Sequence, residues 1–220
     1  MFWKTAHIQS SMPKGNRFIY KHLFEIAYNM GFSNYGGSGQ KKLPNFVTQE
    51  EFEQLFEAII KLEKNSTKAR ARRLRQYRIA ILLGFEGGLR ISEVIGWPMG
   101  QIPRLEKSNV SEVSIKILGK RGKERVVPRP RRFSDKAKEK LPLKISRRAL
   151  QTFITKLGDD VLHRHIGFHT LRHGFGSHLA GQGRPLHEIQ MLMGHSRLDT
   201  TGIYLHANPK IAVEKAREVF

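Results

Sequence analysis

In one stretch of the chain the apolar residues change from helical spacing to alternation, and this change limits the folds that are possible. Over most of the sequence they recur every three or four positions, which is the period of an amphipathic helix. Between residues 109 and 128 they alternate instead, on both sides of the turn Gly119-Lys120-Arg121-Gly122, as in the two strands of a hairpin. The sequence therefore predicts a mainly α-helical fold with one small antiparallel β-sheet (α+β).

Capping and turn residues divide the helical part of the chain. Thr48 and Glu51 have the spacing of a capping box, so a helix is expected to begin there. A strongly apolar run over residues 76–83 predicts a buried helix that ends at Gly87-Gly88. From Ser146 onward the period is helical again. Breaks are expected at Gly158, at Gly181-Gln182-Gly183 and at Asn208-Pro209.

A glycine-rich segment, Gly36-Gly37-Ser38-Gly39, marks the one credible domain boundary. It lacks the Gly-Lys-Ser/Thr ending of a phosphate-binding loop, so a flexible linker is the better interpretation. The sequence thus predicts a short N-terminal arm, residues 1–43, with one helix over residues 17–30. A larger domain is expected over residues 44–220.

The chain carries a large excess of positive charge. Its 39 Lys and Arg stand against 19 Asp and Glu, a formal net charge of +20. Charge of this size repels itself unless a polyanion neutralises it, so nucleic acid is the expected partner and a basic structural protein is the alternative. For the basic run over residues 61–78, a solvated helix face and a phosphate-contacting face are equally good interpretations. The side chains expected to contact nucleic acid are Arg70, Arg72, Arg73, Arg121 and Arg125.

Several classes of protein are excluded by what the sequence lacks. It contains no cysteine, which rules out disulfide scaffolds, thiolate zinc sites and cysteine nucleophiles. The longest apolar run, residues 79–83, is far too short to span a membrane, and the N-terminus does not resemble a secretory signal. We therefore expect a soluble protein of the cytoplasm, associated with the nucleoid.

The histidines near the C-terminus first suggest a metal. His169 and His173 have the i, i+4 spacing that zinc sites use, but no glutamate of the metalloprotease type lies between them, and Arg164 and Arg172 would repel a dication. No metal site is therefore predicted. His169 and Arg172, at i and i+3 on one side of a helix, are better suited to hold one anionic group.

Five short motifs occur in order along residues 44–206, and together they resemble the tyrosine recombinase (phage integrase) family, including its Xer-like members. The last motif places Tyr204 nine residues after His195. The motifs are Gly88-Leu89-Arg90-Ile91-Ser92-Glu93, the hairpin beginning at Gly119-Lys120, His169-Thr170-Leu171-Arg172-His173, Gly194-His195, and Thr200-Thr201-Gly202-Ile203-Tyr204.

The resemblance implies a catalytic domain that cuts and rejoins DNA with no metal, nucleotide or other cofactor. It implies that Tyr204 attacks the scissile phosphate and forms a 3′-phosphotyrosyl link. Arg90 and Arg172 would bind the phosphate as its charge grows, because guanidinium groups stay protonated and pair bidentately with phosphate oxygens.

The resemblance also implies roles for the remaining site residues. His169 and His195 would hydrogen-bond the phosphate and handle protons. Lys120 would protonate the departing 5′-oxygen, with Lys123 as the second candidate for this general acid. Glu93 would orient the arginines.

Site-specific recombination is the expected function. A type IB topoisomerase uses the same chemistry and is the nearest alternative; a DNA-binding protein with a vestigial site is another.

Relatives usually carry a four-helix domain that clamps DNA, so residues 1–43 would be a remnant or a truncated form of it. Self-association on DNA as a dimer or tetramer is expected. The tail, residues 207–220, would dock on a neighbouring subunit or pack on its own domain.

Overall fold

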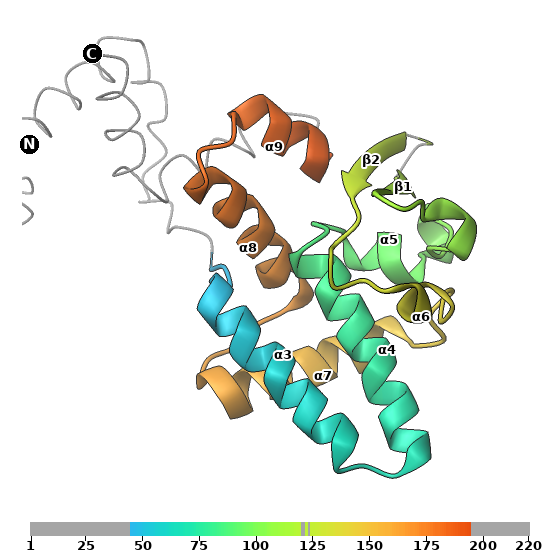
Figure 1. Cartoon of the computed structure of the whole chain (residues 1–220), viewed down its shortest axis with the longest axis vertical. Helices are drawn as coiled ribbons and strands as arrows, with labels where there is room; N and C mark the ends of the chain where they lie inside the picture. Colours follow the sequence, from blue (N-terminus) through green and yellow to red (C-terminus); the bar gives the residue numbers. More distant parts are fainter. Residues whose placement is uncertain (1–44, 120–121, 123, 195–220) are drawn as a thin grey trace, which may run out of the picture. The chain divides into compact units, whose positions relative to one another are not determined.

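A computed structural model describes residues 45–119, 122 and 124–194, and these form a mainly helical fold (Figure 1). The sheet consists of β1 (Ser114–Leu118) and β2 (Glu124–Pro128). The fold class predicted from the sequence is thus confirmed. The helices are α3 (Gln49–Lys64), α4 (Lys68–Phe85), α5 (Ile91–Ile95), α6 (Asp135–Lys138), α7 (Arg147–Leu162), α8 (Phe168–Gly181) and α9 (Leu186–Met193), with 3-10 turns at η2 (Pro98–Gly100) and η3 (Lys107–Asn109).

Helix α3 begins at the predicted capping box. The Thr48 side chain accepts a hydrogen bond from the Glu51 backbone N–H at 3.2 Å, and the Glu51 carboxylate accepts one from the Thr48 N–H at 2.9 Å. The same carboxylate pairs with Arg164 at 2.6 Å, which ties the start of α3 to the segment before α8. A local sequence signal therefore fixes both the helix start and a tertiary contact.

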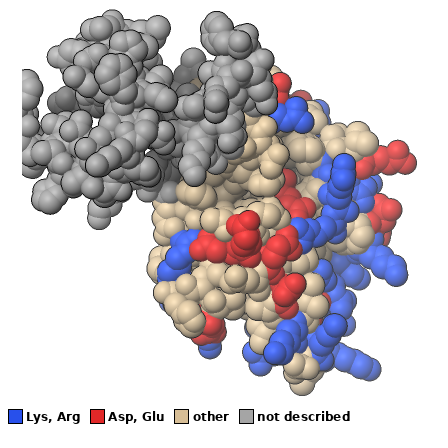
Figure 2. All heavy atoms as spheres, turned by 60° about the vertical axis from the view of Figure 1, so that its left-hand side comes forward, with Lys and Arg blue, Asp and Glu red and all other residues tan. Residues whose placement is uncertain are grey.

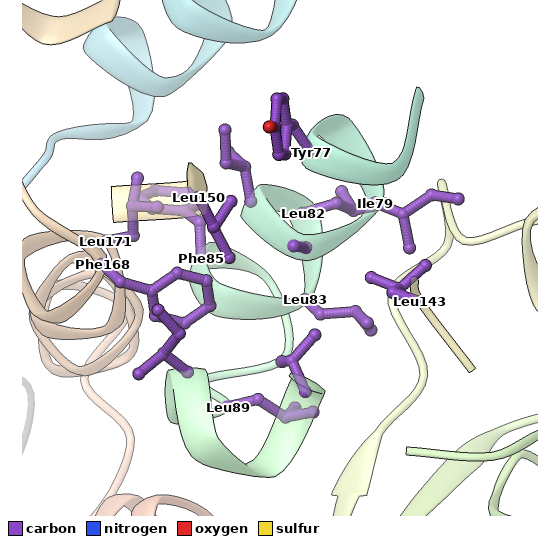
Figure 3. Packing of buried hydrophobic residues seen from close by; sticks show 14 of the residues in the cluster. Tyr77, Ile79, Leu82, Leu83, Phe85, Leu89, Leu143, Leu150, Phe168 and Leu171 are labelled. Atoms are coloured by element: carbon purple, nitrogen blue, oxygen red, sulfur yellow. The ribbon is translucent and has the colours of Figure 1, made fainter. Parts of the chain in front are cut away.

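Helix α4 is the centre of the core. Every residue from Ile79 to Phe85 is buried, so this half of the helix is covered on all sides. Figure 3 shows Leu143, Leu150, Phe168 and Leu171 from other segments around it. The N-terminal half of α4 is rich in arginine and more exposed, so one continuous helix contains both the charged stretch and the buried run.

The two strands form the predicted hairpin, with Ser114 opposite Pro128 and Leu118 opposite Glu124. Ile115, Ile117 and Val127 are buried, whereas Val126 is 58% exposed. The sheet therefore has one apolar face on the core and one face in solvent, as alternation requires.

The predicted break at Gly158 is wrong, because α7 continues through this residue to Leu162. A Cβ atom at Gly158 would lie 2.4 Å from the Ile166 side chain and 2.9 Å from the Arg164 carbonyl oxygen. The glycine thus permits close packing of the returning segment rather than ending the helix. The break predicted at residues 181–183 is confirmed by the end of α8, and Asn208-Pro209 lies outside the described residues.

Within the part of the chain that the structure describes, no helix has the length and apolar character needed to cross a membrane.

Candidate active site

Arg90 lies where the turn after α4 enters α5, at the N-cap of that short helix. Its backbone N–H donates to one Glu93 carboxylate oxygen at 2.7 Å, and its guanidinium donates to the other at 2.8 Å. The Arg90 side chain is 32% exposed, whereas that of Glu93 is 1% exposed. The buried carboxylate therefore orients an arginine that still reaches solvent.

Glu93 binds a second arginine as well. Arg125 of β2 donates from both terminal nitrogens to the two Glu93 oxygens, at 2.6 and 2.7 Å. Burial by itself raises the pKa of Glu93, but the hydrogen bonds and charge of Arg125, followed by those of Arg90, lower it to about 2. The carboxylate is thus ionised and shared between two cations.

Arg172, on α8, is 4% exposed. Its two terminal nitrogens donate to the carbonyl oxygens of Gly88 and Met193. Since Gly88 lies two residues before Arg90 and Met193 two residues before His195, this buried guanidinium joins two of the motifs singled out in the sequence.

Three arginines meet at the end of α9, where the last carbonyl groups of a helix have no partner within the helix. Arg125 Nε donates to the Leu192 carbonyl at 2.9 Å, Arg172 donates to that of Met193, and Arg90 donates to that of Gly194 at 2.9 Å. The position of the chain immediately before His195 is therefore fixed from β2, from α8 and from the start of α5.

The two described histidines of the site lie on α8. His169 is exposed on the first turn, and partial desolvation together with the positive charges of Arg172, Arg147 and Arg90 lowers its pKa. Desolvation, His169 and Arg172 lower the pKa of the half-buried His173. Both rings therefore favour the neutral form at neutral pH, in which one nitrogen can accept a proton.

The remaining predicted residues fall into three groups. Arg125 was expected to contact DNA, but its side chain is 11% exposed and is held by Glu93 and the α9 carbonyl. One sequence signal indicated that Arg125 is held inside the site. It lies two residues from buried Val127 on the same strand, so its side chain is on the inward face of the sheet. Lys120, Arg121, Lys123, His195 and Tyr204 lie outside the described residues.

Arg70, Arg72 and Arg73 lie on the N-terminal half of α4, away from Glu93. They line a groove between α4 and α7, which also includes the segment that leads into α7. The groove wall also contains Tyr77 and Phe153, whose rings stack with centroids 4.6 Å apart.

The ion pairs of Glu93 give the stability of the fold a pH dependence. Because its pKa is lower in the folded chain than the ordinary value of 4.5, these pairs stabilise the fold above that pH, and the stabilisation is lost as the pH falls toward 2. Its size is on the order of 3 kcal/mol. In urea unfolding, the stability difference between wild type and Glu93→Gln is expected to shrink between about pH 5 and pH 2. A difference that stays constant over this range would contradict the assignment.

Known proteins resemble this chain in sequence and in fold. The family described as "Phage integrase family" matches residues 133–210. The tyrosine recombinase XerC of Thermodesulfovibrio yellowstonii is 31% identical over 226 residues, covering 88% of this chain and 70% of that protein. The XerC of Pelotomaculum thermopropionicum is 30% identical over 207 residues, covering 82% of this chain. The chain spans 62% of the length of that second relative.

Solved structures agree on the fold. The XerH site-specific recombinase bound to its difH substrate superimposes with a TM-score of 0.61 at 24% identity, covering 81% of this chain and 55% of that chain. The catalytic domain of bacteriophage HP1 integrase gives a TM-score of 0.52 at 20% identity, covering 78% of this chain and 93% of that domain. The shared sequence and fold show that this chain belongs to the tyrosine recombinase (phage integrase) family.

Proposed function

We propose that the chain is a site-specific recombinase that cleaves and rejoins DNA strands through a 3′-phosphotyrosyl intermediate. The observation that carries this proposal is that Arg172 and Arg90 bind the carbonyl groups of Met193 and Gly194, immediately before His195. His169 lies close enough to both arginines for their charge to lower its pKa. Relatives that align over most of the chain's length are named tyrosine recombinases. The motif Thr200-Thr201-Gly202-Ile203-Tyr204 is the reason to propose Tyr204 as the nucleophile.

The arrangement suits a reaction in which a phosphodiester gains negative charge. Arg90 uses one hydrogen bond from each terminal nitrogen, to Glu93 and to Gly194, and each of these nitrogens carries a second N–H. Because the guanidinium is already held in place, no reorganisation is needed when the phosphate becomes more negative. Arg172 adds a second cation that cannot lose its charge.

Proton transfer falls to residues that titrate. The lowered pKa of His169, caused by desolvation and by the charges of Arg172, Arg147 and Arg90, favours a neutral ring that can accept a proton. His195 would be the second such group, and Lys120 would donate a proton to the leaving 5′-oxygen. These assignments extend the site to residues beyond the described part of the chain.

Neither a metal ion nor ATP is required by this scheme. Arginines supply the positive charge that a metal would otherwise supply, and the phosphotyrosyl link keeps the energy of the broken phosphodiester for the rejoining step. A 5′-hydroxyl of another strand can then reverse the reaction, which is strand exchange.

Double-stranded DNA is the proposed partner, with more than one copy of the chain bound to each site. XerH was crystallised on its difH substrate, and lambda integrase as a dimer on a core site. By analogy, the tail over residues 207–220 would dock on a neighbouring copy. An enzyme with this substrate would act in the cytoplasm at the nucleoid.

A basic groove offers a path for the DNA backbone away from the catalytic centre. No acidic side chain is among the described residues that line it. On the face drawn in Figure 2, most Lys and Arg side chains gather along one side of the described part, with some Asp and Glu among them, and other acidic side chains lie nearer the middle. Arg147, the neighbour of the groove residue Arg148, lies close enough to His169 for its charge to lower the pKa of that ring. Its basic residues are Arg70, Arg72, Arg73, Lys144, Arg148 and Lys156.

Removing a positive charge from the groove should weaken DNA binding and make it less dependent on salt. Each phosphate contact contributes about −0.9 to the slope of log K against log salt, so Arg73→Gln or Arg148→Gln should each reduce the slope by about that amount. Arg75→Gln is the matched control, because Arg75 is on the same helix but faces Glu63 at 3.7 Å. If the two groove variants and the Arg75→Gln control have equal slopes, the groove does not contact the DNA backbone.

The proposed function can be tested without knowing the target site. We expect the full chain, incubated in EDTA with a library of nicked duplexes of random sequence, to form covalent adducts whose captured ends identify the cleavage site. Paired copies of that site should then give recombinant products. Relaxation of supercoiled DNA without recombinants would favour a topoisomerase. Binding with no adduct would favour a vestigial site, and adducts formed only with added Mg²⁺ or Zn²⁺ would refute metal independence.

A further inference from the structure

We propose that Arg125 is a positioning residue that couples the β-hairpin to the segment of Arg90 and to the end of α9. The inference rests on the proposed function, but its structural part can be tested separately. No role of this kind followed from the sequence, where Arg125 was a candidate for DNA contact.

All three guanidinium nitrogens of Arg125 are engaged by other parts of the site. The two terminal nitrogens bind Glu93 at 2.6 and 2.7 Å, and Nε binds the Leu192 carbonyl at 2.9 Å. With 11% of the side chain exposed, these hydrogen bonds are shielded from water, where charge-assisted pairs are strongest. One side chain of β2 thus holds both α5 and the end of α9.

The end of α9 is shaped to admit this side chain. Gly194 has a φ of +61°, and a Cβ atom there would lie 2.9 Å from Cδ and 3.2 Å from Nε of Arg125. A glycine is therefore required twice, by the left-handed backbone and by the close approach of Arg125. This close packing does not depend on the ion pair with Glu93. It is therefore a second, separate observation that Arg125 contacts the end of α9.

Arg125 also determines how strongly Glu93 holds Arg90. The buried carboxylate is shared between the two arginines, so part of its charge is balanced by Arg125. Without Arg125, Glu93 would face Arg90 alone and draw it away from a phosphate. The loss would leave a buried charge undercompensated as well.

The hairpin is the third part that this side chain holds. β1 ends at Leu118 and β2 begins at Glu124, so the turn between them contains both candidate general acids, Lys120 and Lys123. Arg125 is the second residue of β2. Its bonds to Glu93 and Leu192 therefore fix the base of the turn relative to Arg90 and to the segment that precedes His195.

The test compares Arg125→Lys with Arg129→Lys in the full chain. Arg129 is a matched control because its side chain is also 11% exposed and lies just beyond β2, where it pairs with Asp135 at 2.8 Å. At saturating nicked DNA, Arg125→Lys should lower the first-order rate constant of adduct formation by about 10²-fold, the usual effect of misplacing reacting groups by about 1 Å. The DNA affinity should stay within about threefold of wild type, since no DNA contact is removed.

The rate constant and the amplitude separate positioning from folding. A destabilised chain loses amplitude because fewer molecules are folded, whereas a misplaced site loses rate in the molecules that are folded. Arg125→Gln, which keeps hydrogen-bond donors without the charge, serves as the second variant. A wild-type rate constant in both variants, or a loss of amplitude alone, would overturn the proposal.

Hydrogen exchange tests the structural part even if no adduct forms. Amides of residues 189–194 should exchange faster in Arg125→Lys than in wild type or in Arg129→Lys. If the wild-type chain forms no adduct, the proposed function fails, and unchanged exchange would separately show that Arg125 does not hold the end of α9.

Discussion

Tyr204→Phe is expected to abolish covalent capture of DNA while leaving DNA binding unchanged. The substitution removes only the hydroxyl oxygen that would form the phosphotyrosyl bond, so the loss should be complete rather than partial. The measurement is the yield of an SDS-resistant, protease-sensitive adduct on nicked duplex, together with the affinity for the same duplex.

Tyr77→Phe is the matched control for this experiment. Tyr77 is 7% exposed and stacks on Phe153, so its hydroxyl is a poor candidate for attack on DNA. The control should form adducts at the wild-type level. An adduct that persists in Tyr204→Phe would assign the nucleophile to another residue.

Much of the fold could be predicted because its signals are local. The capping box of Thr48 and Glu51 lies within one helical turn, and the alternation of Ile115, Ile117 and Val127 lies within one hairpin. Gly158 shows where such signals fail. A glycine in a helical pattern predicts a break unless the segment that packs against it is known, and that segment comes later in the chain.

For the described part of the candidate site, sequence motifs pointed to residues but not to their contacts. Arg90, His169 and Arg172 were identified from motifs, and the structure brings them together. The pairing of Arg125 with Glu93 joins residues 32 positions apart, and no periodicity links them. Likewise, the three carbonyl groups at the end of α9 accept hydrogen bonds from arginines that come close only when the fold has packed. Backbone acceptors leave no trace in a sequence, since every residue has one.

The second large effect is expected at the hairpin turn. If Lys120 protonates the leaving 5′-oxygen, Lys120→Ala should reduce the cleavage rate by about 10²–10⁴, the usual contribution of a general acid. A substrate with sulfur at the 5′-bridging position should restore the rate, because a thiolate is a far more stable leaving group than an alkoxide and departs without a proton. Lys123→Ala removes the same charge from the same turn and serves as the control: it should cleave the oxygen substrate nearly normally and gain nothing from sulfur. Rescue by sulfur in Lys123→Ala instead would assign the acid to Lys123. Rescue in neither variant would show that neither hairpin lysine is the general acid.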